Sequence, residues 1–502
     1  MPKIVTETSH GQVRGVAQPD GVAFLGIPFA APPTGSGRFR PPEPPQPWTG
    51  VRECVEHGSA CPQPPQSTIP AVQKLVTLPV SEDEDCLYLD VRTPDCDDGR
   101  RPVMVWLHGG GFRNGSGSVW PQQTGSFSRD GVVLVTVNYR LHALGHLHLE
   151  GLFEDSEGSG NLALLDQMAA LRWVQENIAS FGGDPKNVTV FGQSAGGSYV
   201  SILMAMPSAQ GLFQRAVVMS AVGDCTLSPD AAQEVTEAFL NSVGVQPGDW
   251  SALQTLPVER IVTAASRPLF WPRRPADRIM LDFFPVHDGT IVPASPHQAA
   301  VSGALASVPL LVGSTSHEWR LPHFAVPGSY PPPDREALSG LFATSPGTDL
   351  DTVYGDSWKD ASRADIDAAV DTDLLFGIPA LRLAEGRSRH HADVWMYRFD
   401  WPTPVAGGAF GACHGLDVPY VFDALDDVEL LGDEPPTQLA TDMHRAWIRF
   451  AATGNPNGGT LPNWPRYRGD DRRVMIFDEH THLSIDPDRE RRRYWGNWPQ
   501  GD

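Results

Sequence analysis

The stretch NVTVFGQSAGG, residues 187–197, decides the fold predicted for this chain. Its first five residues are rich in β-branched and aromatic side chains, which favours a buried strand. The next five, Gly192-Gln193-Ser194-Ala195-Gly196, fit the pattern G-x-S-x-G, and a helix-like run follows to about residue 206. A strand, a tight turn holding a serine and a helix together indicate the nucleophile elbow of an α/β-hydrolase. Because the five-residue pattern alone is common, an ordinary Gly/Ser turn into a helix is the alternative.

Short apolar runs alternate with helix-like segments on both sides of this elbow. Such alternation predicts a mostly parallel central sheet flanked by helices, with the active site at the carboxyl ends of the strands. We find no linker, repeat or low-complexity block, so we expect one α/β domain over residues 1–502, with long insertions shaping an active-site gorge. The expected strands are 102–107, 132–137, 187–191, 215–219, 308–312 and 393–399, and a long helix covers 162–181.

A glycine-rich loop, His108-Gly109-Gly110-Gly111-Phe112, directly follows the expected strand 102–107. Acyl transfer places negative charge on a former carbonyl oxygen, and backbone N–H donors aimed at that oxygen stabilise the transition state. Glycines let the backbone approach closely because they carry no Cβ. We therefore assign an oxyanion hole to the amides of Gly110, Gly111 and Ala195; the alternative is a flexible loop.

A serine nucleophile needs an imidazole base held by a carboxylate, and in this fold both follow the serine in the chain. His414 stands out because it lies in the small-residue segment 411–417, beyond the strand 393–399. For the acid, Glu318 follows the strand 308–312, while Asp288 and Asp417 compete with it on position. Pattern alone leaves the other downstream histidines open: His287, His297, His317, His323, His390, His391, His444, His480 and His482.

Together these residues resemble the carboxylesterase/cholinesterase (type-B carboxylesterase) family, whose bacterial members include the p-nitrobenzyl esterases and the phenylcarbamate herbicide hydrolases. The resemblance implies a triad of Ser194, Glu318 and His414, and no cofactor. It also implies a supporting hydrogen bond from Ser220, for which an ordinary buried serine is the alternative. Its matching segments cover nearly the whole chain: 24–33, 81–89, the HGGGF loop, 138–140, 165–178, 181–197, 284–289 and 414–422.

Several residues depart from the family's pattern. Gln193 stands where the family usually has Glu before the nucleophile, and this neutral change should alter the electrostatics without abolishing the chemistry. His142 and His146 replace a Gly and a Phe, and His148 follows them. Their spacing could suit a metal, but no carboxylate or cysteine completes an obvious set, so a structural or pocket-lining role is expected and no metal is assigned.

Two cysteines match a disulfide that is common in secreted family members. They are Cys61 and Cys86, and the sequence leaves open whether they pair or stay reduced. The chain shows no cationic segment followed by an apolar stretch at its start, so we expect a cytoplasmic protein.

Composition narrows the possible partners. With 38 Lys and Arg against 60 Asp and Glu, the net charge is −22, which argues against nucleic acid and anionic membranes. No apolar run reaches the ~18 residues of a spanning helix. The sequence does not predict the oligomeric state.

The walls of the substrate pocket are expected to come from residues 62–80, 267–284 and 321–345. Aromatic side chains in these segments indicate an apolar pocket: Phe270, Trp271, Phe283, Phe284 and Phe324.

The sequence thus predicts a serine carboxylesterase that acts on a small ester through an acyl-enzyme intermediate. Three alternatives remain: the same machinery acting on an aryl carbamate, amide or lactone; a non-catalytic binding protein of the same fold; and a metallohydrolase using His142, His146 and His148.

Overall fold

A computed structural model describes residues 3–65, 69–223, 225–266, 283–325, 353–354 and 361–496. A 13-stranded mixed sheet runs through it, in the order β1-β2-β3-β5-β7-β6-β8-β9-β10-β11-β12-β13, with β4 paired to β2. The strands are β1 (Lys3–Thr8), β2 (Gly11–Gln18), β3 (Gly21–Pro28), β4 (Val51–Glu53), β5 (Tyr88–Thr93), β6 (Arg101–Leu107), β7 (Val133–Val137), β8 (Gly183–Gln193), β9 (Arg215–Met219), β10 (Leu310–Thr315), β11 (Val394–Phe399), β12 (Arg473–Phe477) and β13 (His482–Ile485).

The centre of the sheet, from β7 to β12, is parallel, whereas most pairings toward its two edges are antiparallel. All six strands expected from the sequence are present, although β10 begins at Leu310 and continues to Thr315. The expected long helix is α4 (Leu162–Asn177), and a 3-10 turn, Ile178–Phe181, completes it.

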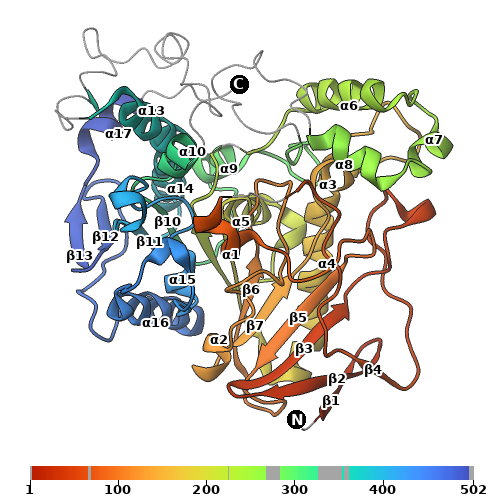
Figure 1. Cartoon of the computed structure of the whole chain (residues 1–502), viewed down its shortest axis with the longest axis horizontal. Coiled ribbons are helices and arrows are strands. Elements are labelled where there is room, and N and C mark those ends of the chain that lie inside the picture. The colour runs from red at the N-terminus through yellow and green to blue at the C-terminus, as the bar shows by residue number, and fades with distance from the viewer. Residues whose placement is uncertain are drawn as a thin grey trace.

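Helices cover both faces of the sheet (Figure 1). The helices of the described residues are α1 (Pro70–Val76), α2 (Ser126–Arg129), α3 (His142–His146), α4, α5 (Ala195–Ala205), α6 (Pro229–Val243), α7 (Trp250–Gln254), α8 (Val258–Ser266), α9 (Pro296–Ser302), α10 (Arg320–Ala325), α13 (Arg363–Thr372), α14 (Ile378–Ser388), α15 (Val418–Val421), α16 (Thr437–Thr453) and α17 (Arg489–Trp495). A π-helical turn, η5 (Asp373–Gly377), joins α13 to α14.

Two hydrophobic cores lie on opposite faces of the sheet because side chains alternate along each strand. In β6, Val103, Val105 and Leu107 pack into one core with α4 and α5. The intervening Met104 and Trp106 pack into the other core with α15 and α16. Both faces are therefore buried, as the continuous apolar runs of the central strands predict.

The two family-matched cysteines, Cys61 and Cys86, are buried free thiols in the structure. A hydrogen bond between them, together with burial, raises the pKa of the Cys86 thiol well above its usual value. Within the described ranges, no helix is long and apolar enough to cross a membrane.

Candidate active site

Ser194 occupies the sharp turn between β8 and α5. Its backbone lies at φ 59° and ψ −126°, which is strained for a residue with a side chain. Its N–H donates to the carbonyl of Met219 on the neighbouring strand over 2.9 Å, which fixes the turn. A Cβ on Gly196 would come within 2.0 Å of the Leu107 carbonyl oxygen. The G-x-S-x-G pattern therefore meets a steric need, and the nucleophile elbow predicted from the sequence is present.

The glycine loop after β6 packs directly against this elbow. A Cβ on Gly109 would lie 2.8 Å from the backbone oxygen of Gln193. Gly110 and Gly111 adopt φ angles of 117° and 63°, which glycine tolerates without strain. Among the described residues, no acceptor pairs with the backbone N–H of Gly110, Gly111 or Ala195. The three amides predicted to form the oxyanion hole are thus left available to a ligand.

Neighbouring segments hold this loop in place from behind. The N–H of His142 donates to the carbonyl of Phe112 over 2.8 Å. Gln63 accepts from the N–H of Gly115 over 2.8 Å and donates to its carbonyl over 3.1 Å. Because these contacts anchor the end of the loop and its start continues directly from β6, its free amides need little reorganisation when a substrate binds.

His414 and Glu318 meet beyond the carboxyl ends of β10 and β11. The Nδ1 atom of His414 lies 2.5 Å from Oε2 of Glu318, whose side chain is fully buried. The backbone N–H of Thr315 donates to Oε1 of Glu318 over 2.8 Å. The competing carboxylates have other partners: Asp288 accepts from Asn161, and Asp417 accepts from Tyr397. Within the described residues, Glu318 is the carboxylate that hydrogen-bonds to His414.

The other ring nitrogen of His414 faces the elbow. Its Nε2 atom lies 3.2 Å from Nε2 of Gln193, the residue directly before Ser194. An amide N–H can donate to the lone pair of a neutral imidazole, which a Glu carboxylate could not do. In the described residues this amide, and not the hydroxyl of Ser194, hydrogen-bonds to the imidazole. Hydrogen bonds between nucleophile and base are often long in ligand-free hydrolases and tighten in the substrate complex.

The description of the matching family model is "Carboxylesterase family", and the match covers residues 2–338 and 348–495. The chain belongs to the carboxylesterase family. It is 39% identical to the para-nitrobenzyl esterase of Bacillus subtilis (strain 168) over 98% of each chain. It is 32% identical to the phenmedipham hydrolase of Pseudarthrobacter oxydans, over 96% of this chain and 97% of that one.

Solved structures agree with this assignment. The crystal structure of a Geobacillus stearothermophilus carboxylesterase superposes with a TM-score of 0.84 at 36% identity, covering 98% of this chain and 99% of that one. This likeness and the parallel centre of the sheet establish the α/β-hydrolase fold. The chain is a carboxylic ester hydrolase by family.

Ser220 lies beside the elbow of this carboxylesterase. It follows β9 with φ 47°, and its N–H donates to the Gly313 carbonyl over 2.8 Å. Its hydroxyl is buried and has no hydrogen-bond partner among the described residues. The supporting hydrogen bond expected of it stays a prediction.

An aromatic wall on His414 was missed by the sequence analysis. The ring of Phe376, from η5, lies 4.8 Å from the imidazole centroid, and Trp319 lies 5.9 Å from it. Phe376 and Trp319 also contact each other at 5.3 Å. Trp319 directly follows Glu318 and could have been suspected from that position. Phe376 belongs to a segment with no motif, so no signal in the sequence marked it.

The aromatic residues expected to line the pocket are only partly described. Phe284 packs on Phe112 of the glycine loop at 5.1 Å, and Phe283 packs on Phe239 at 5.8 Å. Phe324 lies under the guanidinium of Arg320. Phe270 and Trp271 lie outside the described residues, as does most of 267–284 and 321–345.

The three histidines that depart from the family pattern have separate surroundings. The Nε2 atom of His142 lies 2.7 Å from the Pro62 carbonyl, and Nε2 of His146 lies 2.6 Å from the Tyr199 hydroxyl. Burial lowers the pKa of His142 to about 4 and that of His146 to about 3, and it also lowers the pKa of His148. Across the described part of the chain, no three metal-ligating side chains form a group.

Proposed function

We propose that this carboxylesterase cleaves small apolar or aromatic esters with Ser194 as nucleophile, His414 as general base and acid, and Glu318 as the carboxylate that holds the imidazole. The observation that carries the proposal is the 2.5 Å contact between His414 and the buried Glu318. It lies beside a strained serine elbow and a loop with free amides. This combination is what acyl transfer requires.

The reaction proceeds in two halves. His414 takes the proton of Ser194 as its oxygen attacks the ester carbonyl, and the oxyanion lies among the amides of Gly110, Gly111 and Ala195. His414 then protonates the leaving alcohol, and the acyl group stays on the serine. Water, deprotonated by the same imidazole, releases the acid and restores the serine. Glu318 stays ionised throughout, fixes the tautomer of the imidazole and stabilises its cation.

The amide of Gln193 faces the lone pair of the His414 imidazole that Ser194 must use. The Nε2 atom of a neutral imidazole offers one lone pair, so a full hydrogen bond from Ser194 requires the Gln193 amide to move aside. The small residues around it, Gly109 and Gly415, leave its side chain between two backbone loops.

The direct test is hydrolysis of p-nitrophenyl acetate and butyrate by the wild type and by Ser194→Ala, with a serine-directed organophosphate as a labelling control. The proposal expects turnover by the wild type, a stoichiometric block by the reagent and neither turnover nor labelling in the variant. A folded wild type that neither turns over nor labels would refute it and would favour a non-catalytic binding protein. The relative named a phenmedipham hydrolase favours aryl carbamates as the second substrate class to assay.

A further inference from the structure

The π-helical turn η5, Asp373–Gly377, reaches from the active site to the C-terminal helix of the described chain. Such turns carry one residue more than an α-helical turn and are frequent at functional sites. On one side of η5, Phe376 packs on the His414 imidazole at 4.8 Å. The turn is also bonded to the loops of the site, because the Gly223 N–H donates to the Leu375 carbonyl over 2.8 Å.

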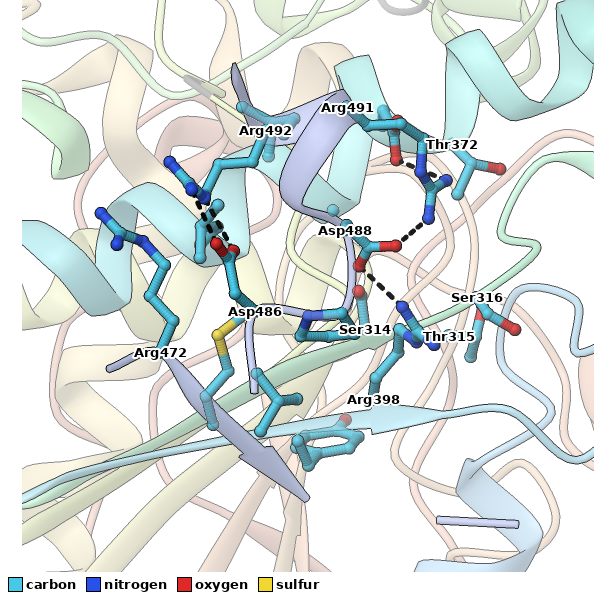
Figure 2. A pocket seen from close by; sticks show the side chains of 18 residues that line it. Ser314, Thr315, Ser316, Thr372, Arg398, Arg472, Asp486, Asp488, Arg491 and Arg492 are labelled. Atoms are coloured by element: carbon cyan, nitrogen blue, oxygen red, sulfur yellow. Dashed lines mark hydrogen bonds and ion pairs between the residues drawn. The ribbon is translucent and has the colours of Figure 1, made fainter. Parts of the chain in front are cut away.

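The other side of η5 borders a cavity whose lining includes Thr315 and Ser316 (Figure 2). Asp373 lines this cavity and is 5% exposed. Its Oδ1 atom accepts from Arg491 of α17 over 3.2 Å, and its Oδ2 atom accepts from the Tyr354 hydroxyl over 2.5 Å. The same turn therefore presents an aromatic ring to the catalytic histidine and a carboxylate to the C-terminal helix.

Arg491 is the centre of a chain of ion pairs around this cavity. It also pairs with Asp488, which accepts from Arg398 of β11 over 2.7 Å, as the dashed lines in Figure 2 show. Burial raises the pKa of Asp373, and the charge of Arg491 opposes this shift. Removing the cation from a buried ion pair strongly destabilises the folded arrangement of its carboxylate. We therefore expect the position of Asp373 to depend on Arg491.

Apolar packing adds to this contact. Tyr494 and Trp495 of α17 share a small hydrophobic core with Val370 of α13, Leu374 of η5 and Ile378 of α14. Figure 1 shows α17 next to α13, away from the strands β1–β4. The C-terminal helix thus lies against the helical segment whose middle turn carries Phe376.

We propose that Arg491 is a positioning residue of the active site: its ion pair with Asp373 fixes η5 and so holds Phe376 against His414. The inference rests on the proposed role of His414. In this proposal α17 contributes no group to the reaction but helps to orient the His414 imidazole.

The chain offers a matched control in the next residue. Arg492 belongs to the same helix and pairs with Asp486 over 2.8 and 2.7 Å, but Asp486 lies outside η5. We would measure kcat and KM for p-nitrophenyl acetate, and the thermal unfolding midpoint, for Arg491→Met, Arg491→Lys and Arg492→Met. Arg491→Met should lower kcat about tenfold with KM changed less than about threefold, as expected of residues that act through a neighbouring element. Arg491→Lys should recover part of the loss, and Arg492→Met should stay within about twofold of the wild type.

A double-mutant cycle tests whether the effect passes through Phe376. If it does, Phe376→Leu should lower kcat by a similar factor, and adding Arg491→Met should cost little more. The variant Asp373→Asn/Arg491→Met removes both charges, so it keeps the test usable if the unpaired carboxylate unfolds the single variant. It should show the same loss of kcat as Arg491→Met.

Two results would overturn this inference and leave the proposed function standing, because the wild type would still be an active esterase. One is that the effects of Arg491→Met and Phe376→Leu on kcat multiply independently. The other is that Arg491→Met and Arg492→Met have equal kcat. A wild type that is inert toward esters, like Ser194→Ala, would overturn the proposed function and this inference with it.

Discussion

Replacing Gly109 with alanine should slow ester hydrolysis on the order of a hundredfold while leaving KM nearly unchanged. A Cβ at this position would meet the Gln193 backbone oxygen at 2.8 Å and the Ser194 Cβ at 3.1 Å, whereas ordinary contacts begin at 3.4 Å. The glycine loop must therefore retreat from the elbow by about half an ångström, because neither contact is with a flexible chain end.

A shift of that size acts on the transition state more than on the substrate. The oxyanion donors must lie 2.7–3.1 Å from the developing charge, and removing one of them costs about 2.7–4 kcal/mol. We expect a value at the lower end, about 2.7 kcal/mol, because the donors are displaced and not removed. Gly109 does not have a left-handed φ, so backbone strain should not contribute to the difference in kcat between Gly109→Ala and the wild type.

The assay is steady-state hydrolysis of p-nitrophenyl butyrate, with circular dichroism to show that the variant is folded. Gly469→Ala is the control, because a Cβ there would meet nothing within 4 Å in the described residues. If Gly109→Ala keeps wild-type kcat, the loop does not supply the oxyanion donors. If only KM rises, the loop binds the substrate without stabilising the transition state.

Three further predictions concern the carboxylate, the buried histidines and metals. Glu318→Gln should lower kcat on the order of 10³–10⁴-fold in a folded protein, since the neutral amide cannot stabilise the imidazolium; wild-type kcat would exclude Glu318 as the acid. Burial holds the pKa of His146 at about 3, so this residue is neutral in the folded state and charged in the unfolded state below its usual pKa of 6.5. Stability should fall as the pH falls from 6.5 toward 3, and His146→Phe should remove about 2–3 kcal/mol of that loss at pH 4.5, as measured by urea unfolding; an unchanged pH slope would contradict it. Dialysis against EDTA should leave kcat/KM unchanged, and a loss restored by zinc would return His142, His146 and His148 to consideration.

The parallel centre of the sheet could be predicted because its strands are buried on both faces and read as continuous apolar runs. The outer strands could not be. In β2, GQVRGVAQ, only Val13 and Gly15 are buried, and no clear alternation marks the strand. Short turns join β2 to β1 and to β3, but its pairing with β4 sets Gln12 opposite Val51. That pairing is long-range information that the local pattern does not carry.

The candidate site divides in the same way. Ser194 and the glycine loop lie within motifs whose geometry the local sequence dictates. The choice of Glu318 over Asp288 and Asp417 rested on resemblance, because three carboxylates near strand ends are equivalent until the loops fold. The tertiary structure separates them, since Asp417 points to Tyr397 and Asp288 to Asn161. Phe376 could not be found at all, because a π-helical turn has no recognisable residue pattern.

Four of the non-glycine residues with positive φ lie where the chemistry is proposed to occur. Phe112, His142, Ser194 and Ser220 come from four separate segments, and each has a positive φ between 41° and 62°. Such conformations cost of order 1–3 kcal/mol each and persist only when the surroundings fix them. His142 shows the trade most clearly, because the family pattern has glycine at its position, where the same φ would carry no strain. Its side chain instead reaches the Pro62 carbonyl while its N–H supports Phe112. The histidine therefore has a strained backbone, but it adds a second contact between the glycine loop and the segment of Pro62 and Gln63, which also binds Gly115. A rigid loop holds its free amides in place, so they need little reorganisation in the proposed reaction.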